Sequence, residues 1–288
     1  MEILVDPNST RSIINRHGAL GVEWVENLPQ QLERLAQKWN LVDWQAVAGS
    51  VTACIFFATQ NGNPVVIKTA PDHPRLAKEA LALQQWLPSG LVPGVIDQEP
   101  GCYLMSRIIP GTAWQGDDEK VFQALRILGS QDTRRCNGII TADEQLITRL
   151  SRLQMQQAGY EMGVTSQDFI AARNLISQAP ESGLPFQLLH TDLHPQALLN
   201  GQGDLPQLVD PSPAWGPAAW DLAAWIAKSG GPNMESRIIA GSDYLGYSTE
   251  YVRQIARAVA IEGAAVTARY GLASQAQVDE LLAWGRGG

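Results

Sequence analysis

The amino-acid pattern changes near residues 105–115, and this change limits the possible folds more than any other feature. Before it, WQAVAGSVTACIFFATQNGNPVVIKTA (44–70) predicts strands with an Asn-Gly turn at 61–63, and a helix follows from Pro74 to about Leu87. Residues 1–40 predict a helical lead-in. After the change the spacing is mostly helical, and only 186–190 and 206–210 predict strands. This segregation indicates an α+β protein with two parts, 1–105 and 106–288.

Composition and charge limit the classes of binding partner that the chain can have. The chain has 288 residues, 45% of them hydrophobic and 17% charged, with a net charge of −8. Nucleic acids and anionic membranes are bound through basic patches, so an acidic chain disfavours both and suits a cationic small molecule. The N-terminus lacks a signal-peptide pattern, and no stretch of 18 apolar residues occurs. The three cysteines have neither zinc nor disulfide spacing, so we expect a cytoplasmic protein with reduced thiols.

Lys68 and Glu79 are the first pair with chemical significance. Lys68 ends the apolar strand VVIK, and Glu79 lies eleven residues later in the predicted helix. Each residue alone is most simply a solvent-exposed charge. Together, a strand lysine and a helix glutamate can form an ion pair that directs the lysine toward the phosphates of a nucleotide.

The segment QLLHTDLHPQALLNGQGDLPQLVDPS (187–212) concentrates polar chemistry between short apolar strands. Asp192 and Asp210 each follow a predicted strand, and His190 and His194 flank Asp192. Clustered carboxylates repel one another unless a cation or a proton lies between them, and Mg²⁺ with a polyphosphate is one such cation. A polar turn without chemistry and a metal-dependent hydrolase built on the HxDxH run are the alternatives.

The motifs HTDLHPQALL (190–199) and LVDPSPAWGPAAWDLAAW (208–225) resemble those of the aminoglycoside phosphotransferase superfamily. The family pattern is H-G-D-x-H-x-x-N, then a strand ending in I-D, then a helix with G-x-P-x-x-D-L-A. The streptomycin/hydroxyurea kinase group is the nearest by this pattern. Matching elements run from about Gly49 to Trp225, which is most of the chain. The resemblance implies a protein-kinase-like two-lobed α+β fold, with a small N-terminal antiparallel-sheet lobe and a larger helical C-terminal lobe.

The resemblance also implies the cofactors, ATP and Mg²⁺, and the residues that bind the nucleotide. Lys68 would contact the phosphates and Glu79 would hold Lys68. Gly49 and Ser50 lie in the loop AGSVTA, which would cover the phosphates although it has a single glycine. The backbone from Ser106 to Ile108 would pair with adenine.

In the C-terminal part the resemblance assigns the chemistry of transfer. Asp192 would be the catalytic aspartate that orients the acceptor hydroxyl, and Asp210 would hold magnesium. Asp221 would be a buried residue that supports the catalytic loop. His190 and His194 are expected to shape that loop rather than to transfer protons, because phosphoryl transfer needs positioning and charge neutralisation more than a strong base.

Two residues depart from the family pattern. Ala197 stands where the family has the asparagine that binds a second magnesium ion, and a methyl group cannot coordinate a cation that requires oxygen. Thr191 replaces a glycine that often serves a special backbone angle. Gln196 is a possible substitute ligand, whereas Asn200 with Gly201 is better explained as a type I′ hairpin turn. One magnesium held by Asp210, a substitute ligand and a catalytically dead relative all remain open.

The acceptor is the least constrained part of the prediction. Asp117, Asp118 and Glu119 form an acidic cluster that is either a solvated helix start or an attractor for amino groups. Trp114, Trp215 and Trp220 are either sugar-binding walls or core residues. We therefore expect an ATP-dependent kinase that phosphorylates a hydroxyl of a small amino-bearing molecule, such as an aminoglycoside or an amino sugar. The alternative is a pseudoenzyme that binds a nucleotide or small ligand without transfer.

Overall fold

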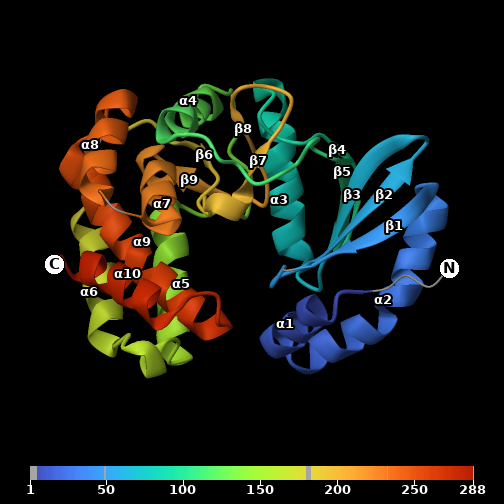
Figure 1. The fold of residues 1–288 in the computed structure, drawn as a ribbon, viewed down its shortest axis with the longest axis horizontal. Coiled ribbons are helices and arrows are strands. Elements are labelled where there is room, and N and C mark those ends of the chain that lie inside the picture. Colours follow the sequence, from blue (N-terminus) through green and yellow to red (C-terminus); the bar gives the residue numbers. More distant parts are fainter. Residues whose placement is uncertain (1–4, 49, 180–182, 232, 288) are drawn as a thin grey trace. The chain divides into compact units, whose positions relative to one another are not determined.

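A computed structural model describes residues 5–48, 50–179, 183–231 and 233–287, which form two compact units, Met1–Gly111 and Thr112–Gly288 (Figure 1). The sequence predicts a boundary after residue 105, six residues earlier. Ser106 and Arg107 donate backbone hydrogen bonds to Gly94 and Pro64, and these bonds keep the end of the last strand with the first unit. The two units are described separately below.

The first unit is a five-stranded antiparallel sheet with helices on both faces. The sheet has the order β1-β2-β3-β5-β4, with β1 Leu41–Val47, β2 Cys54–Gln60, β3 Asn63–Thr69, β4 Val95–Glu99 and β5 Cys102–Ser106. The helices are α1 Pro7–His17, α2 Ala19–Lys38 and α3 His73–Trp86, and the 3-10 turn η1 Leu87–Ser89 follows α3.

Local sequence explains these elements. Asn61 and Gly62 both have positive φ (50° and 81°), and Gln60 pairs with Asn63, so the predicted Asn-Gly turn is the tight connection between β2 and β3. The side chain of Asp72 caps α3 by accepting from the Arg75 amide. Helix α3 therefore begins at His73, one residue before the predicted start.

Alternation along β3 decides what each face of the sheet contacts. Ile67 pairs with Phe56 and Leu104, and these apolar side chains belong to the core that also includes α1 and α2. Lys68, the next residue, pairs with Tyr103 and points to the opposite face, where α3 packs. The strand pattern thus directs Lys68 toward α3.

The second unit is helical and carries two short antiparallel strand pairs. Its helices are α4 Asp118–Gly129, α5 Ala142–Met155, α6 Ser166–Gln178, α7 Ala219–Ser229, α8 Met234–Leu245, α9 Thr249–Tyr270 and α10 Gln275–Arg286, with the 3-10 turns η2 Tyr160–Met162 and η3 Pro195–Ala197. β6 Gln187–Leu189 pairs with β9 Ala214–Gly216, and β7 Leu198–Asn200 pairs with β8 Pro206–Leu208. Helix α9 packs against α5, α6, α7, α8 and α10 and is the centre of this unit.

Capping boxes open two helices of the second unit. Thr141 with Glu144 opens α5, and Thr165 with Asp168 opens α6. The predicted type I′ turn at Asn200 is wrong. Asn200 is the last residue of β7 and pairs with Pro206, so residues 201–205 form a longer connection, and Asn200 itself is held by the loop at 112–113.

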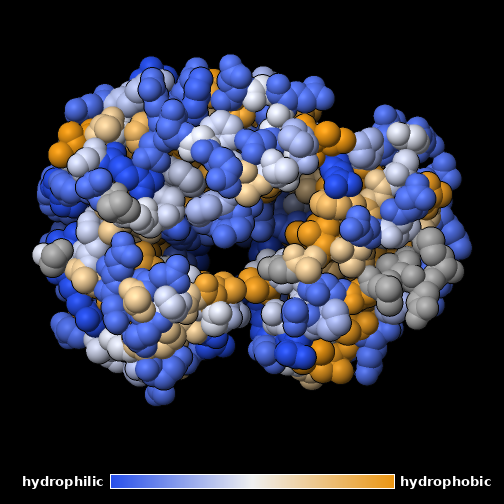
Figure 2. All heavy atoms as spheres, in the orientation of Figure 1, coloured by the Kyte–Doolittle hydropathy of each residue, from blue (hydrophilic) through white to orange (hydrophobic). Residues whose placement is uncertain are grey.

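The surface is largely polar. Hydrophilic colours cover most of the face in Figure 2, and apolar residues appear between them. The most exposed large apolar side chains are Met155, Leu20 and Leu272. Within the described ranges, no helix has the length and apolarity that crossing a bilayer requires.

Candidate functional site

A buried ion pair joins β3 to α3 in the first unit. Nζ of Lys68 lies 2.6 Å from Oε2 of Glu79, and the side chains are only 3% and 1% exposed. The Tyr103 hydroxyl donates to the same carboxylate oxygen at 3.2 Å. Removing two charges from water costs several kcal/mol per ion, and a buried pair is weak evidence for stability alone. The predicted ion pair is therefore present, and it is buried. Stability alone does not explain why two charged residues are buried here.

Arg75 adds a second cation to Glu79 that the sequence analysis missed. One turn before Glu79 on α3, its guanidinium forms an ion pair with Oε1, and Nη2 donates to the carbonyl of Thr52 at 2.8 Å. Arg75 thus ties the loop before β2 to the residue that holds Lys68. Its spacing of i, i+4 from Glu79 is the signal that would have identified it.

The other predicted nucleotide-binding residues that the structure describes lie in or beside the connections between strands. Ser50 is half-buried in the loop between β1 and β2, and Gly49 lies outside the described residues. The Ser106 amide donates to Gly94 O at 2.9 Å, and its hydroxyl accepts from the Gly94 amide. The amides of Ser106 and Arg107 are therefore both bonded within the first unit, so an amide of this segment that pairs with adenine would be that of Ile108. Ile108 is half-buried.

In the second unit, Asp221 anchors the loop that follows β6. Its carboxylate accepts hydrogen bonds from the amides of His190 (3.0 Å) and Thr191 (2.7 Å) and is 2% exposed. Burial raises the pKa of Asp221 to about 6, and the two amide bonds offset part of that rise. The side chain thus lies buried beneath the loop that carries Asp192.

Thr191 has a left-handed backbone conformation, with φ of 51°. This conformation explains why glycine suits the position, because a β-branched residue with positive φ is strained. The Thr191 hydroxyl donates to Oε1 of Gln145 at 2.8 Å and also contacts the Ser212 carbonyl. Threonine lacks the conformational freedom of glycine, but its hydroxyl forms hydrogen bonds to α5 and to the segment after β8.

His190 is enclosed by the loop and by the segment before Asp210. It is fully buried, and its Nε2 donates to the carbonyl of Val209 at 2.9 Å, which leaves Nδ1 as an acceptor facing the Asp192 amide at 3.4 Å. Burial lowers the pKa of His190 to about 4, so the ring is neutral. Ser212 also donates to the His190 carbonyl, and these bonds hold the segments around Asp192 and Asp210 together.

The predicted catalytic aspartate forms an ion pair with Lys228. Nζ of Lys228, at the end of α7, lies 2.5 Å from Oδ1 of Asp192 and 3.4 Å from Oε2 of Glu262 on α9. Arg149 of α5 lies 3.5 Å from the other oxygen of Glu262. Burial raises the pKa of Asp192, but the charges of Lys228 and Arg149 lower it by more than burial raises it. The pKa of this carboxyl therefore lies far below its usual value, and the group is ionised.

Sequence reasoning missed Lys228, Arg149 and Glu262. Lys228 carries one local signal: it lies seven residues after Asp221, two helical turns on, and so shares its face of α7. Arg149 and Glu262 carry no such signal, because only the packing of α5 and α9 brings them near α7.

Asp210 lies at the end of the segment after β8 and has φ of 61°, again in the left-handed region. It is half-buried, and a carboxylate in this position is chemically suited to a magnesium ion. Across the described parts of the chain, His, Cys, Asp and Glu side chains do not gather in a group of three or more that could hold a metal ion.

The side chains near position 197 do not fit a second metal ion. Ala197 is fully buried at the end of η3. Nδ1 of His194 and Oε1 of Gln196 form a hydrogen bond at 2.9 Å, so the predicted substitute ligand is engaged. Asn200 donates to the Thr112 hydroxyl and to the Ala113 carbonyl. The residues present are thus compatible with one metal ion held by Asp210. They are not compatible with a second metal ion held by side chains at 196, 197 or 200.

Of the acidic cluster, Asp118 is bound within the unit, whereas Asp117 and Glu119 are exposed. Asp117 caps α4, and Asp118 accepts from Arg237 at 2.6 Å and 2.9 Å and from Nε1 of Trp225 at 2.8 Å. Trp215 and Trp220 are buried, and Trp114 is half-buried. Core packing thus accounts for two of the three tryptophans considered as sugar-binding walls.

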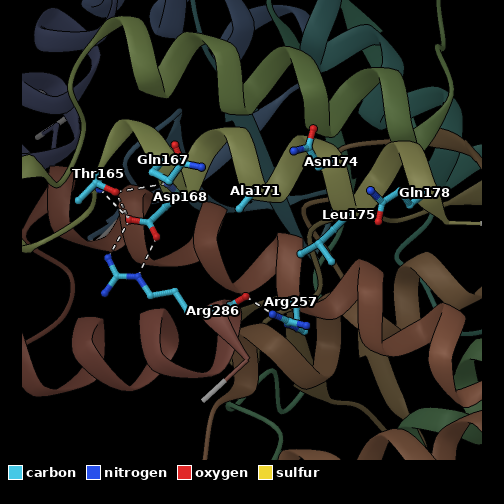
Figure 3. Close-up of a pocket in the computed structure, with 10 residues that line it drawn as sticks. Thr165, Gln167, Asp168, Ala171, Asn174, Leu175, Gln178, Arg257 and Arg286 are labelled. Carbon is cyan, nitrogen blue, oxygen red and sulfur yellow. Dashed lines mark hydrogen bonds and ion pairs between the residues drawn. The ribbon is translucent and has the colours of Figure 1, made fainter.

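A pocket of about 540 Å³ lies between α6, α9 and α10 (Figure 3). The Asp168 carboxylate and the Arg286 guanidinium point toward each other at its edge and form a bidentate pair at 2.7 Å and 2.8 Å. None of the predicted site residues lines this pocket. It is therefore separate from the loop that carries Asp192.

Comparison with known proteins establishes the fold. No family model matches the chain, and no curated protein matches its sequence. Choline kinase from Streptococcus pneumoniae is 16% identical, with a TM-score of 0.65 over 90% of this chain and 99% of its own. Aminoglycoside phosphotransferase APH(4)-Ia is 14% identical, with a TM-score of 0.64 over 91% of this chain and 99% of its own. Macrolide 2'-phosphotransferase from Brachybacterium faecium is 16% identical, with a TM-score of 0.57 over 91% and 99%.

These structures confirm the predicted fold class. The chain has the kinase-like two-lobed α+β fold, with its antiparallel sheet in the N-terminal unit and its helices mainly in the C-terminal unit. At 14–16% identity the likeness is one of fold. Its neighbours include a choline kinase and aminoglycoside and macrolide phosphotransferases, and a nearness to the streptomycin/hydroxyurea group stays a prediction.

Proposed function

We propose that the protein is an ATP-dependent phosphotransferase that moves the γ-phosphoryl group to a hydroxyl of a small amino-bearing molecule. The observation that carries this proposal is the buried Lys68–Glu79 ion pair. Apolar residues of similar size would serve stability at least as well as a buried pair, so its presence favours a role in binding. An oriented ammonium is suited to the phosphates of a nucleotide.

The roles of the remaining residues follow from the same proposal. Lys68 contacts the phosphates of ATP, and Arg75 and Glu79 hold it in place. Asp192 orients the acceptor hydroxyl, while Asp221 fixes the loop on which Asp192 lies. Magnesium, when bound, neutralises phosphate charge, and Asp210 is the residue that would hold it.

The acceptor class rests on chemistry shared by the structural neighbours. They include a choline kinase, and APH(4)-Ia has been solved in a ternary complex with AMP-PNP and hygromycin B. Choline and hygromycin B both combine a hydroxyl with a positively charged nitrogen. The motif resemblance adds streptomycin, and the macrolide phosphotransferases add macrolides.

The test is transfer of radiolabelled γ-phosphate from ATP to choline, hygromycin B, streptomycin and a macrolide, with the Asp192→Asn variant as control. Labelled product with the wild type and none with Asp192→Asn supports the proposal. Full transfer by the variant contradicts the role of Asp192. Calorimetric titration with ATP, with and without magnesium, checks the nucleotide site independently, and magnesium should strengthen binding.

A second candidate function is binding of a nucleotide or small ligand without transfer. The buried methyl group of Ala197 favours it, because an oxygen ligand is missing where the family has asparagine. Magnesium-independent ATP binding without labelled product from any acceptor, or from water, would support this candidate over the kinase.

A further inference from the structure

Lys228 is surrounded by charged side chains. Its ammonium lies 2.5 Å from Asp192 and 3.4 Å from Glu262, and the side chain is 13% exposed. Glu262 in turn lies 3.5 Å from Arg149. The four side chains come from the loop after β6 and from α5, α7 and α9, so three helices converge on one carboxylate of the loop.

The hydrogen-bond geometry leaves Lys228 with donors to spare. An ammonium has three N–H donors. Within the described residues, Lys228 donates one side-chain hydrogen bond, to Asp192, and its approach to Glu262 is an ion pair without hydrogen-bond alignment. Oε2 of Glu262 and Nε of Arg149 are buried there without hydrogen-bond partners. Unsatisfied buried polar atoms are uncommon and call for a functional explanation.

The same loop lacks an oxygen ligand for a second metal ion. Ala197 presents a methyl group, Gln196 is bonded to His194, and Asn200 is bonded to residues 112 and 113. Phosphoryl transfer depends on positive charge placed at the transferred group. Among the described residues, Lys228 is a cation in direct contact with Asp192.

We propose that Lys228 is a positioning residue for phosphoryl transfer, which holds the carboxylate of Asp192 in place and supplies positive charge on the acceptor side that a second metal ion would otherwise supply. Glu262 holds the Lys228 ammonium near Asp192 from the α9 side, and Arg149 of α5 lies beside Glu262. This role rests on the proposed function, because it has meaning only if phosphoryl transfer occurs at Asp192.

The experiment compares the full-length wild type with Lys228→Met, Lys228→Arg and Glu262→Gln, using MgATP and an acceptor that the wild type phosphorylates, or water if none is found. We expect Lys228→Met to lower kcat about a hundredfold, the loss typical for one aligned donor or cation at a transition state. KM and Kd for MgATP should stay within about twofold, since Lys68 belongs to the other unit. Lys228→Arg should restore most of kcat, and Glu262→Gln should cost less than Lys228→Met.

Arg237→Met is the matched control. Arg237 also forms a partly buried ion pair with an aspartate in the second unit, at 2.6 Å, but its partner is Asp118. This variant should lower the unfolding midpoint and leave kcat unchanged. If Lys228→Met does not fold, Lys228→Gln provides a neutral donor of similar length, and the same loss of kcat is expected.

The outcomes separate the two proposals. Wild-type kcat in Lys228→Met or Lys228→Gln, with none in Asp192→Asn, overturns the role of Lys228 and leaves the proposed function intact. Equal losses of kcat in Lys228→Met and Arg237→Met would assign Lys228 to stability alone. No transfer to any acceptor or to water by the wild type overturns the proposed function and this role with it.

Discussion

The backbone amide of Thr191 donates a hydrogen bond of 2.7 Å to Oδ1 of Asp221, which fixes the loop before Asp192 to helix α7. The His190 amide donates to the other oxygen, so one buried carboxylate satisfies two consecutive amides. Backbone amides buried without acceptors are costly, and the loop therefore depends on this side chain for its conformation.

Replacing Asp221 with asparagine should destabilise the protein. The asparagine side chain has one carbonyl oxygen where the carboxylate has two. Its NH₂ group would therefore face a backbone N–H, and two donors cannot form a hydrogen bond. We expect a loss of about 2 kcal/mol in the free energy of unfolding, the range for a hydrogen bond to a buried charge. Urea unfolding at pH 7.5 measures it. Asp221→Ala should cost more, and equal stability of all three proteins would contradict the anchoring role.

Thr191 offers a test of strain against hydrogen bonding. Thr191→Val keeps the branched shape in the left-handed conformation but removes the hydroxyl that bonds to Gln145 and Ser212. The lost bond and the unpaired Gln145 oxygen should cost about 2 kcal/mol. Thr191→Ser keeps the hydroxyl and removes the strained branch, so its stability should equal or exceed that of the wild type. The reverse order would show that the methyl group is what the site requires. Chemical unfolding of both variants decides between these outcomes.

The buried histidine predicts a pH dependence. His190 has an unfolded pKa of about 6.5 and a native pKa of about 4. Between these values the unfolded chain binds a proton that the native chain does not bind. Its contribution to stability is therefore present above about pH 6.5 and lost as the pH falls toward 4, by about 3 kcal/mol at most.

Asp221 acts in the opposite direction over part of this range. Its raised native pKa of about 6 gives stability at low pH that is lost as the pH rises through 6. The useful quantity is therefore the difference between wild type and His190→Gln, which keeps a donor for the Val209 carbonyl. Urea unfolding from pH 7.5 to 5 should show a steeper acid loss for the wild type, and parallel curves would contradict the neutral buried ring.

Local patterns predicted many of the elements, although not the strands β7 and β9, and they did not predict the contacts between elements. The Asn61-Gly62 turn and both capping boxes depend on residues within a few positions, and all are present. Lys228 and Asp192 are 36 residues apart, and Arg237 and Asp118 are 119 apart. Periodicity indicates which face of a helix is apolar, whereas the partner of a polar side chain depends on how that helix packs.

Arg75 connects the loop before β2 to the Lys68–Glu79 pair, so we expect its removal to weaken ATP binding. Arg75→Met removes the bond to the Thr52 carbonyl and the second cation on Glu79. We expect ATP to bind about tenfold more weakly, which corresponds to about 1.4 kcal/mol. Lys78→Met, on the same helix, is the control and should bind ATP as the wild type does. Isothermal calorimetry measures the ATP affinity of both variants. Unchanged affinity in Arg75→Met would contradict a role of this loop in nucleotide binding.

Ala197→Asn tests whether the missing asparagine is a simple defect. The Cβ of Ala197 is fully buried, so an added amide must displace neighbours and lose water without assured partners. Overpacking of this kind costs about 1–3 kcal/mol, and an unpaired buried amide adds to it. If Lys228 supplies the charge on the acceptor side, the variant should lose stability and gain no transfer activity. Urea unfolding and the radiolabel assay measure the two effects, with Ala197→Ser as the control for polarity without bulk. A large gain in transfer would instead identify a kinase site damaged at this one position, and the gain should then persist in Ala197→Asn combined with Lys228→Met.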